Sequence, residues 1–270
     1  MKSCITLSLV PSLKGGPWIL WDDLDKGLKT ASEMGFDGVE LFTASPSVNS
    51  KDSLSSLLEK YNLSLGAVGT GAGKVLHGLS LTDQNPEIRN QATTFVKEMI
   101  DFGAEYGAPT ILGSMQGSFS NDVPREQALG YLRDALEVLG DYAESKGTFF
   151  IYEPLNRYET NLFNHFGKAA DFLKELSTKK VMLLADLFHM NIEEENIAES
   201  IISNSESVGH VHFADSNRRP VGYGHTDFMP IASCLKKINY SGYISAEAFS
   251  WPDPQRAAQK TIDSFRKYFS

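Results

Sequence analysis

Short apolar runs alternate with longer amphipathic stretches along almost the whole chain. The apolar runs have the length of buried strands, whereas the stretches between them repeat their apolar positions at helical spacing. The predicted strands are Ile5–Val10, Gly38–Phe42, Leu63–Val68, Thr110–Leu112, Thr148–Tyr152, Val181–Ala185, Val208–Phe213 and Tyr243–Ala246. The predicted helices are Trp21–Met34, Ser53–Tyr61, Pro86–Tyr106, Pro124–Lys146, His165–Leu176, Glu193–Ser203, Phe228–Ile238 and Pro254–Tyr268. Strands that alternate with helices in this way indicate parallel βαβ units.

Several predicted helices end in a glycine just before the next strand, as at Gly35, Gly107 and Gly147, which is typical of helix C-caps. A chain of 270 residues has the length of a single (β/α)8 barrel. We therefore expect one barrel domain over residues 1–270, since neither a linker nor a shift in composition interrupts the pattern. An open doubly wound sheet is the alternative, but no glycine-rich dinucleotide loop follows the first strand. The sequence TGAGKV at Thr70–Val75 lacks the spacing of a phosphate-binding loop, and we expect a flexible loop there.

Composition and charge exclude several classes of function. No apolar run approaches the roughly 20 residues that a membrane span requires, and the N-terminal run SCITLSLV is interpreted as a first strand rather than a signal peptide. The net charge of −9 argues against nucleic acid as a partner. Cys4 and Cys234 are too few and too far apart for a disulfide framework, so we expect two buried thiols and a cytoplasmic protein.

Four successive predicted strands end at a residue that can bind a metal ion. They are Glu153 in TFFIYEP, Asp186 in VMLLAD, His212 in VGHVHF and Glu247 in YISAEAF. Taken alone, a carboxylate at a strand end is usually a helix cap or a surface charge, and a lone histidine is usually a core residue. In a barrel, however, the carboxyl ends of all strands meet at one mouth, where catalytic groups lie. The repeated pattern therefore predicts one metal site.

Three carboxylates and one imidazole form an oxygen-rich set of ligands. Such a set favours Mn2+, Mg2+ or Co2+ over a zinc site built from thiolates, and we expect one divalent ion, with Mn2+ as the first choice. A cation also relieves the repulsion between carboxylates, some of which would otherwise take up protons. His210 precedes His212 by two positions and points to the same face of its strand. From the residues alone, either histidine can be the ligand.

Longer motifs around these residues resemble the xylose isomerase-like superfamily of sugar isomerases and epimerases, and within it the ketose 3-epimerases that act on D-tagatose and D-allulose. The motifs are EPLNRYETNLFN (Glu153–Asn164), LLADLFHMNIEE (Leu183–Glu194), GHVHFADSNRRPVGYGHTDF (Gly209–Phe228) and the strand-end Glu247. The segment GTGAGKVLHGLSLTD (Gly69–Asp83) is similar to the related 5-keto-L-gluconate epimerases. The resemblance extends over the barrel and is most specific between residues 150 and 250.

The resemblance implies a role for each matching residue. It assigns the metal to the four strand-end residues Glu153, Asp186, His212 and Glu247, with His212 as the ligand in place of His210. It implies that Glu153 and Glu247 are also the catalytic acid–base pair. The residues that it implies for substrate binding are Glu159, His189 and Arg218.

The implied enzyme is a divalent-metal-dependent epimerase of a free ketose or a keto sugar acid. It would invert the carbon next to the carbonyl through a cis-enediolate, with the two glutamates as acid and base. Its expected partner is a small sugar, and the implied assembly is a homodimer or a homotetramer. We expect neither nucleic acid nor a membrane as a partner.

Rival functions on the same barrel stay open at this point. An aldose–ketose isomerase similar to hydroxypyruvate isomerase shares the enediolate and differs only in where the proton returns. A metal-dependent dehydratase of a cyclic keto acid would use the same ion. An endonuclease IV-like enzyme would need a basic face and more than the 6 histidines present. A non-catalytic sugar-binding barrel would be expected to lack one of the paired glutamates.

The identity of the substrate depends on side chains of the early βα loops. Plausible contacts there are Leu9, Trp18, Glu40, Thr70, Lys74 and Met115. Lys74 or Arg219 can pair with the carboxylate of a keto acid, although a solvated surface charge explains each of them more simply. Asn156, Arg157 and His225 belong to the matching motifs and are further candidates for ligand contact.

Overall fold

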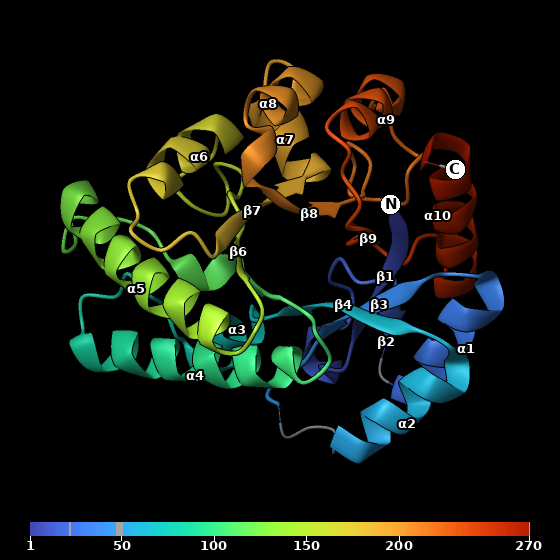
Figure 1. Ribbon diagram of the computed structural model, residues 1–270, viewed down its shortest axis with the longest axis horizontal. Helices are drawn as coiled ribbons and strands as arrows, with labels where there is room; N and C mark the ends of the chain where they lie inside the picture. Colours follow the sequence, from blue (N-terminus) through green and yellow to red (C-terminus); the bar gives the residue numbers. More distant parts are fainter. Residues whose placement is uncertain (22, 47–50, 270) are drawn as a thin grey trace.

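The chain folds into a closed barrel of parallel strands surrounded by helices (Figure 1). The computed structural model describes residues 1–21, 23–46 and 51–269. Within these ranges, 8 strands form the barrel in the order β1-β3-β4-β5-β6-β7-β8-β9, and the pairing of β1 with β9 closes it. The strands are β1 (Lys2–Ser8), β2 (Leu20–Trp21), β3 (Gly38–Phe42), β4 (Ser64–Gly69), β5 (Thr110–Leu112), β6 (Phe150–Tyr152), β7 (Val181–Asp186), β8 (Val208–His212) and β9 (Tyr243–Ala246). The short β2 pairs with the end of β1.

Helices occupy the connections between the barrel strands and cover the outside of the barrel (Figure 1). They are α1 (Leu24–Met34), α2 (Lys51–Tyr61), α3 (Ala72–His77), α4 (Pro86–Ala104), α5 (Arg125–Ser145), α6 (Phe166–Lys174), α7 (Leu187–Glu193), α8 (Ile197–Ser203), α9 (Phe228–Lys237) and α10 (Pro254–Phe269). Short 3-10 turns are η1 (Pro11–Leu13), η2 (Ser114–Gln116) and η3 (Ser205–Ser207). The predicted (β/α)8 barrel is confirmed. In the described ranges, no helix combines the length and apolarity needed to cross a membrane.

The ends of the helices follow local side-chain chemistry. Asp23 accepts a hydrogen bond from the backbone N–H of Lys26 and begins α1, and Gly35 ends this helix in the left-handed conformation, with a φ of 82°. Asn85 caps α4 directly before Pro86, whose missing N–H costs nothing in the first turn. These signals are readable in the sequence, and β3, β5 and β9 begin and end at the predicted residues.

The strand predicted at Ile5–Val10 is β1 over Lys2–Ser8, and three predicted connections also need correction. The segment Thr70–Val75 is not a flexible loop, because residues 72–77 form α3. The helix predicted at Trp21–Met34 begins later, at Leu24; Trp21 belongs to β2, and Asp22 lies outside the described residues. The third correction concerns the connection that follows β7.

The helix predicted at Glu193–Ser203 is the shorter α8, over Ile197–Ser203, and a further helix that was not predicted, α7, follows β7 without a loop. The cause is Asp186, the last residue of the strand. Its carboxylate accepts hydrogen bonds from the backbone N–H groups of Phe188 (2.8 Å) and His189 (3.0 Å), as an N-cap does. The side chain that ends the strand therefore also starts the helix.

The inner face of the barrel combines an apolar cluster with polar side chains. The cluster consists of Ala67, Ile111, Ile151 and Leu184. Ala67 pairs with Glu40 on β3, and Leu184 pairs with His210 on β8. Paired residues of parallel strands point to the same face, so these polar side chains also point inward. The two cysteines, Cys4 and Cys234, are buried and free, as predicted.

Gly38 leaves no room for a side chain between β3, β4 and β9. A Cβ at this position would lie 2.8 Å from the carbonyl oxygen of Ser64 and 3.0 Å from the ring of Tyr243. We expect Gly38→Ala to lower the free energy of unfolding by roughly 1–3 kcal/mol, because overpacking forces the strands to shift. Gly130→Ala in α5 is the control, since a Cβ there meets nothing within 4 Å. It should be neutral or slightly stabilising. Urea unfolding followed by circular dichroism measures both variants, and equal stabilities would contradict this account.

Candidate active site

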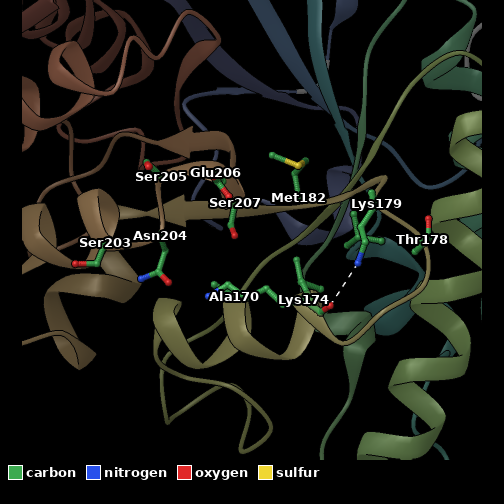
Figure 2. A pocket seen from close by; sticks show the side chains of 12 residues that line it. Ala170, Lys174, Thr178, Lys179, Met182, Ser203, Asn204, Ser205, Glu206 and Ser207 are labelled. Atoms are coloured by element: carbon green, nitrogen blue, oxygen red, sulfur yellow. Dashed lines mark hydrogen bonds between the residues drawn. The ribbon is translucent and has the colours of Figure 1, made fainter.

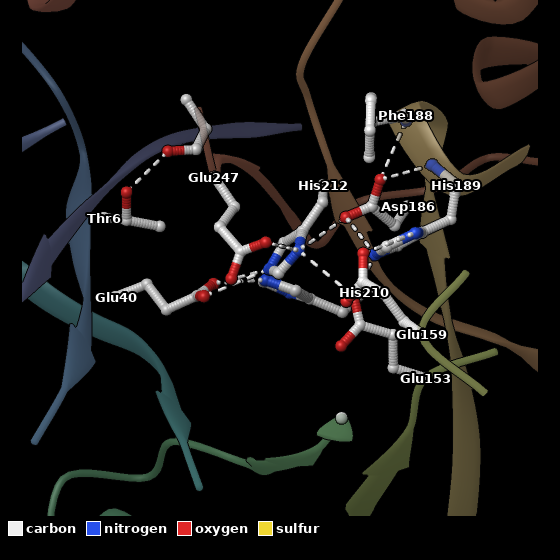
Figure 3. A network of polar contacts seen from close by, with 12 residues as sticks. Thr6, Glu40, Glu153, Glu159, Asp186, Phe188, His189, His210, His212 and Glu247 are labelled. Carbon is white, nitrogen blue, oxygen red and sulfur yellow. Dashed lines mark hydrogen bonds and ion pairs between the residues drawn. The ribbon is translucent and has the colours of Figure 1, made fainter. Parts of the chain in front are cut away.

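Four successive strands deliver a polar side chain to one point at the mouth of the barrel. Asp186 and His212 are the last residues of β7 and β8, whereas Glu153 and Glu247 directly follow β6 and β9. One ligand atom of each residue lies within 4.8 Å of the others. Figure 3 shows these side chains pointing toward one another from different strands. The structure thus brings the four predicted metal ligands together.

The ionisable groups of this site have pKa values that are shifted in different directions. Burial raises the pKa of Glu153 well above its ordinary value. The negative charges of Glu247 and Asp186 raise this pKa further, whereas His212 and Arg218 lower it only in part. Burial opposes ionisation of Asp186 as well, yet His189 and His212 hold the pKa of that carboxyl well below its usual range. Burial lowers the pKa of His212, but the acidic groups around it raise this pKa well above its ordinary value. The group therefore retains protons that a cation would displace.

The residues present fit a divalent cation. Among the described side chains, three buried polar atoms at this site, Oε1 of Glu153, Nε2 of His189 and Nε of Arg218, have no hydrogen-bond partner. Three carboxylates and an imidazole are the hard ligands that Mg2+ or Mn2+ prefers. Buried polar atoms without a partner are costly, and a cation or a substrate bound here would satisfy them.

His212, and not His210, faces the carboxylates. Its Nδ1 lies 3.2 Å from Oδ2 of Asp186, 3.7 Å from Oε1 of Glu153 and 3.8 Å from Oε2 of Glu247. The Nε2 atom of the same ring faces away from them, toward Glu40. The ring of His210 lies outside the four-residue group, and its Nε2 is also directed at Glu40.

His189, on α7, presents one ring nitrogen to the site. Its Nδ1 accepts a hydrogen bond from the backbone N–H of Asn156 at 3.2 Å and lies 2.7 Å from the side-chain amide nitrogen of the same residue. Because both groups of Asn156 are donors, the ring proton belongs on Nε2. That nitrogen lies 3.9 Å from Glu153 and 3.8 Å from Asp186. The structure thus positions an N–H donor at the mouth.

Arg218 approaches the site from the β8–α9 loop. Its guanidinium lies 2.5 Å from Oε2 of Glu247 and 3.3 Å from Oε1 of Glu159, and 4.8 Å above the ring of Phe188. Burial works against its charge, but Glu247, Asp186 and Glu159 raise the pKa of Arg218 above its ordinary value. The permanently charged guanidinium of Arg218 therefore lies beside Glu247, directly after β9.

Asp215 holds the loop that carries Arg218. Its carboxylate accepts hydrogen bonds from the backbone N–H groups of Ser216 (2.8 Å), Gly222 (2.8 Å) and Thr226 (3.1 Å). Burial raises the pKa of this carboxyl, but the backbone N–H groups of the loop hold it below its usual range. Arg218 has a φ of 56°, in the left-handed region that non-glycine residues rarely adopt. These hydrogen bonds fix the loop and thereby the position of the Arg218 side chain.

Four of the remaining candidates from the motifs and early loops have other surroundings. Arg157 of the β6–α6 loop pairs with Glu193 at 2.8 Å, and His225 is exposed and lines a separate pocket near α8. Arg219 lies 4.1 Å over the ring of Trp251. Glu40 is not in an exposed loop but is buried inside the barrel, against His210 and His212.

The sequence places Glu40 in a strand, but its burial against His210 and His212 was not predicted. Burial opposes its ionisation, yet His212 and His210 hold the pKa of this carboxyl well below its usual range. The signal was present in the sequence, since Glu40 interrupts the apolar run GVELF of a buried strand. The same signal identified the four strand-end residues.

A separate pocket of about 490 Å³ lies between α6, η3 and the start of β7 (Figure 2). It includes Met182, near the first residue of β7, whereas Asp186 is the last residue of that strand. The pocket therefore opens away from the barrel mouth. The ammonium group of Lys179 in its wall is bonded to the carbonyl oxygens of Leu176 and Lys174. We assign no role to this pocket.

Comparison with known proteins relates this geometry to one family. Residues 28–268 match the family described as xylose isomerase-like TIM barrel. The chain is 30% identical over 229 residues to L-ribulose 3-epimerase of Methylomonas sp. (strain DH-1), covering 83% of this chain and 78% of that protein. It is also 30% identical over 239 residues to 3-dehydro-D-guloside 4-epimerase of Escherichia coli (strain K12), covering 85% of this chain and 89% of that protein. The solved structure of D-psicose 3-epimerase with D-tagatose from Clostridium cellulolyticum H10 superposes with a TM-score of 0.83 over 100% of both chains, at 23% identity, and shows the same fold.

The role of Asp215 predicts a local loss of stability. We expect Asp215→Ala to lower the free energy of unfolding by roughly 1–3 kcal/mol, because it leaves backbone N–H groups of the loop without an acceptor. Asp171→Ala removes an exposed carboxylate 3.0 Å from Lys174 and, as the control, should change stability by less than about 0.5 kcal/mol. Because the pKa of Asp215 is lower in the folded state, its contribution should be complete at neutral pH and decrease below about pH 4. Urea unfolding at pH 7 and pH 3 measures this difference, which would be absent if the carboxylate did not hold the loop.

Proposed function

The chain belongs to the family of xylose isomerase-like TIM barrels, and from this premise we propose that it is a divalent-metal-dependent sugar epimerase. It inverts the carbon next to the carbonyl of a free ketose or a keto sugar acid. One geometric observation carries the proposal. Glu153 and Glu247 reach the same point from strands that are separated by β7 and β8, with Asp186 and His212 between them. Epimerisation needs such a pair, because a proton leaves one face of a carbon and another returns to the opposite face.

The names of two relatives support the position of the inverted carbon. An L-ribulose 3-epimerase acts on the carbon beside the carbonyl of a 2-ketose. A 3-dehydro-D-guloside 4-epimerase acts on the carbon beside a carbonyl at position 3. The two reactions differ in sugar and in numbering, but both invert a carbon that is acidified by a neighbouring carbonyl. This shared chemistry is what we carry over to the present chain.

The residues that would hold the ion are Glu153, Asp186, His212 and Glu247. A bound divalent ion polarises the substrate carbonyl and the adjacent hydroxyl, and thereby stabilises the negative charge that develops on these oxygens by several kcal/mol. The carboxylates perform the proton transfers. One of Glu153 and Glu247 removes the proton from the carbon, and the other returns a proton from the opposite side. General acid–base catalysis of this kind contributes typically about 10²–10⁴-fold.

The neighbouring donors orient the sugar. His189 directs its Nε2–H toward the four-residue group, and Arg218 brings a guanidinium to Glu247. We propose that both donate hydrogen bonds to substrate oxygens, where fixed donors stabilise developing negative charge. Glu159 lies within reach of Arg218 and Asn156 and would accept a hydrogen bond from a substrate hydroxyl.

Three finer elements belong to the same proposal. Mn2+ is the ion that we expect, with Mg2+ or Co2+ as substitutes, because the ligand set is rich in oxygen. The two free cysteines agree with a reducing compartment such as the cytoplasm. We further propose a homodimer or a homotetramer, on the strength of the family resemblance.

The function is tested by incubating the enzyme and Mn2+ with ketohexoses, ketopentoses, keto-uronates and a 3-dehydro glycoside in deuterated water. We expect at least one epimer pair to interconvert, with deuterium on the inverted carbon. Chelation of the metal should abolish the reaction, and added Mn2+ should restore it. Deuterium on the terminal carbon of a ketose, with aldose as the product, would identify an aldose–ketose isomerase. Turnover of none of these sugars would overturn the proposal.

Glu247→Gln separates the chemistry from folding. We expect the variant to fold and to lose at least about 10²-fold in kcat, because the amide cannot carry the proton. Glu137→Gln is the control, since Glu137 accepts backbone hydrogen bonds from Ser177 and Thr178 on the outside of the barrel and should not affect turnover. Metal content is measured in parallel, because Glu247 is also a proposed ligand. Near-wild-type epimerisation by Glu247→Gln would remove it from the catalytic pair.

A further inference from the structure

Glu40 is a buried carboxylate on the opposite side of His212 from the proposed metal ligands. It lies in the middle of β3, is 5% exposed and projects into the barrel. Figure 3 shows Glu40 on one side of the two imidazole rings and Asp186 on the other. Glu40 precedes His212 by 172 residues in the sequence, so the contact joins two distant parts of the chain. A charged side chain in this position requires partners, and among the described residues two imidazoles hydrogen-bond to it.

Both partners are imidazole nitrogens. Nε2 of His212 lies 3.0 Å from Oε1 and 3.3 Å from Oε2 of Glu40, and Nε2 of His210 lies 2.9 Å from Oε2. An ionised carboxylate can only accept hydrogen bonds, so each imidazole must direct an N–H at it. A neutral imidazole that carries its proton on Nε2 has its lone pair on Nδ1. For His212, that is the nitrogen 3.2 Å from Asp186.

We propose that Glu40 is a positioning residue that fixes His212 in the Nε2–H tautomer and thereby presents the Nδ1 lone pair to the metal ion. The inference rests on the proposed function, because it takes the four-residue group to be the metal site. Carboxylates that accept the second N–H of a ligating histidine orient the ring and strengthen it as a ligand. Glu40 acts through His212 and does not itself touch the ion or the substrate.

His210 contributes to the same arrangement from the side. Its N–H engages Oε2 of Glu40, while His212 is nearest to Oε1. Each carboxylate oxygen thus has an imidazole partner, which restrains rotation of the carboxylate plane. This explains why the strand VGHVH carries two inward histidines although only one faces the metal ligands.

The same three residues could hold a second cation instead, because their ligand atoms also lie within 4.8 Å of one another. That arrangement would require His212 to give up both ring protons and to bridge two cations. The N···O distances of 2.9 and 3.0 Å are those of ordinary N–H···O hydrogen bonds. We therefore assign Glu40 to hydrogen bonding, and the second ion becomes an outcome of the test.

The test uses full-length protein with 15N-labelled histidine and Mg2+ as a diamagnetic ion, together with calorimetric titration of Mn2+. In the wild type, we expect one Mn2+ per chain, a protonated Nε2 on His212 and an unprotonated Nδ1. Glu40→Gln should fold and weaken Mn2+ binding by about 10–100-fold, with loss of the defined tautomer. Glu40→Leu should weaken binding at least as much, since it keeps no acceptor. Glu137→Gln, which also removes one carboxylate charge, should bind Mn2+ as the wild type does.

The outcomes separate this inference from the proposed function. If Glu40→Gln retains wild-type Mn2+ affinity and the same His212 tautomer, Glu40 is not a positioning residue, although the epimerase proposal stands. If the wild type binds two Mn2+ ions per chain and Glu40→Gln binds one, the three residues form a second metal site and the inference is overturned. If the wild type binds no Mn2+, both proposals fail together. Thermal unfolding of each variant confirms that a loss of affinity does not reflect a loss of fold.

Discussion

The His212 imidazole connects two groups of buried carboxylates inside the barrel, and its position sets the geometry of the whole site. One ring nitrogen faces the carboxylates of Asp186, Glu153 and Glu247, and the other faces Glu40. These partners come from β3, β6, β7 and β9, and closing the barrel is what places β3 across from the others. An open parallel sheet with the same strand order would leave Glu40 remote from His212. The barrel must therefore close for Glu40 to reach His212 and for the charges at the mouth to be balanced.

This concentration of buried charge is tolerated because nearly every group has a partner. Asp186 accepts hydrogen bonds from the first turn of α7, Glu40 is held by two imidazoles, and Glu247 is paired with Arg218. Buried charges without such partners are strongly unfavourable. Glu153 is the exception, since burial raises its pKa and one of its oxygens has no hydrogen-bond partner. The least satisfied carboxyl is thus one of the two to which we assign proton transfer.

The sequence predicted the architecture more completely than the connections at the mouth. Apolar strands and glycine caps are local signals, so the barrel and several strand boundaries were predictable. The helices α3 and α7 were missed, and α7 starts where it does because Asp186 is both strand end and helix cap. The clustering of the four strand-end residues followed from barrel geometry alone. The pairing of Glu40 with His212 did not, because a contact across 172 residues leaves no local pattern, although a carboxylate inside an apolar strand does mark the residue itself.

We propose that four strand ends form one metal site and that Glu40 holds the His212 ligand in place from its other side. Anomalous diffraction from crystals of the protein grown with Mn2+ would locate the ion. We expect a single anomalous peak per chain, bounded by Glu153, Asp186, Glu247 and Nδ1 of His212. A peak between Glu40 and His210, or the absence of a peak at the four-residue group in crystals of protein that is active with Mn2+, would contradict it.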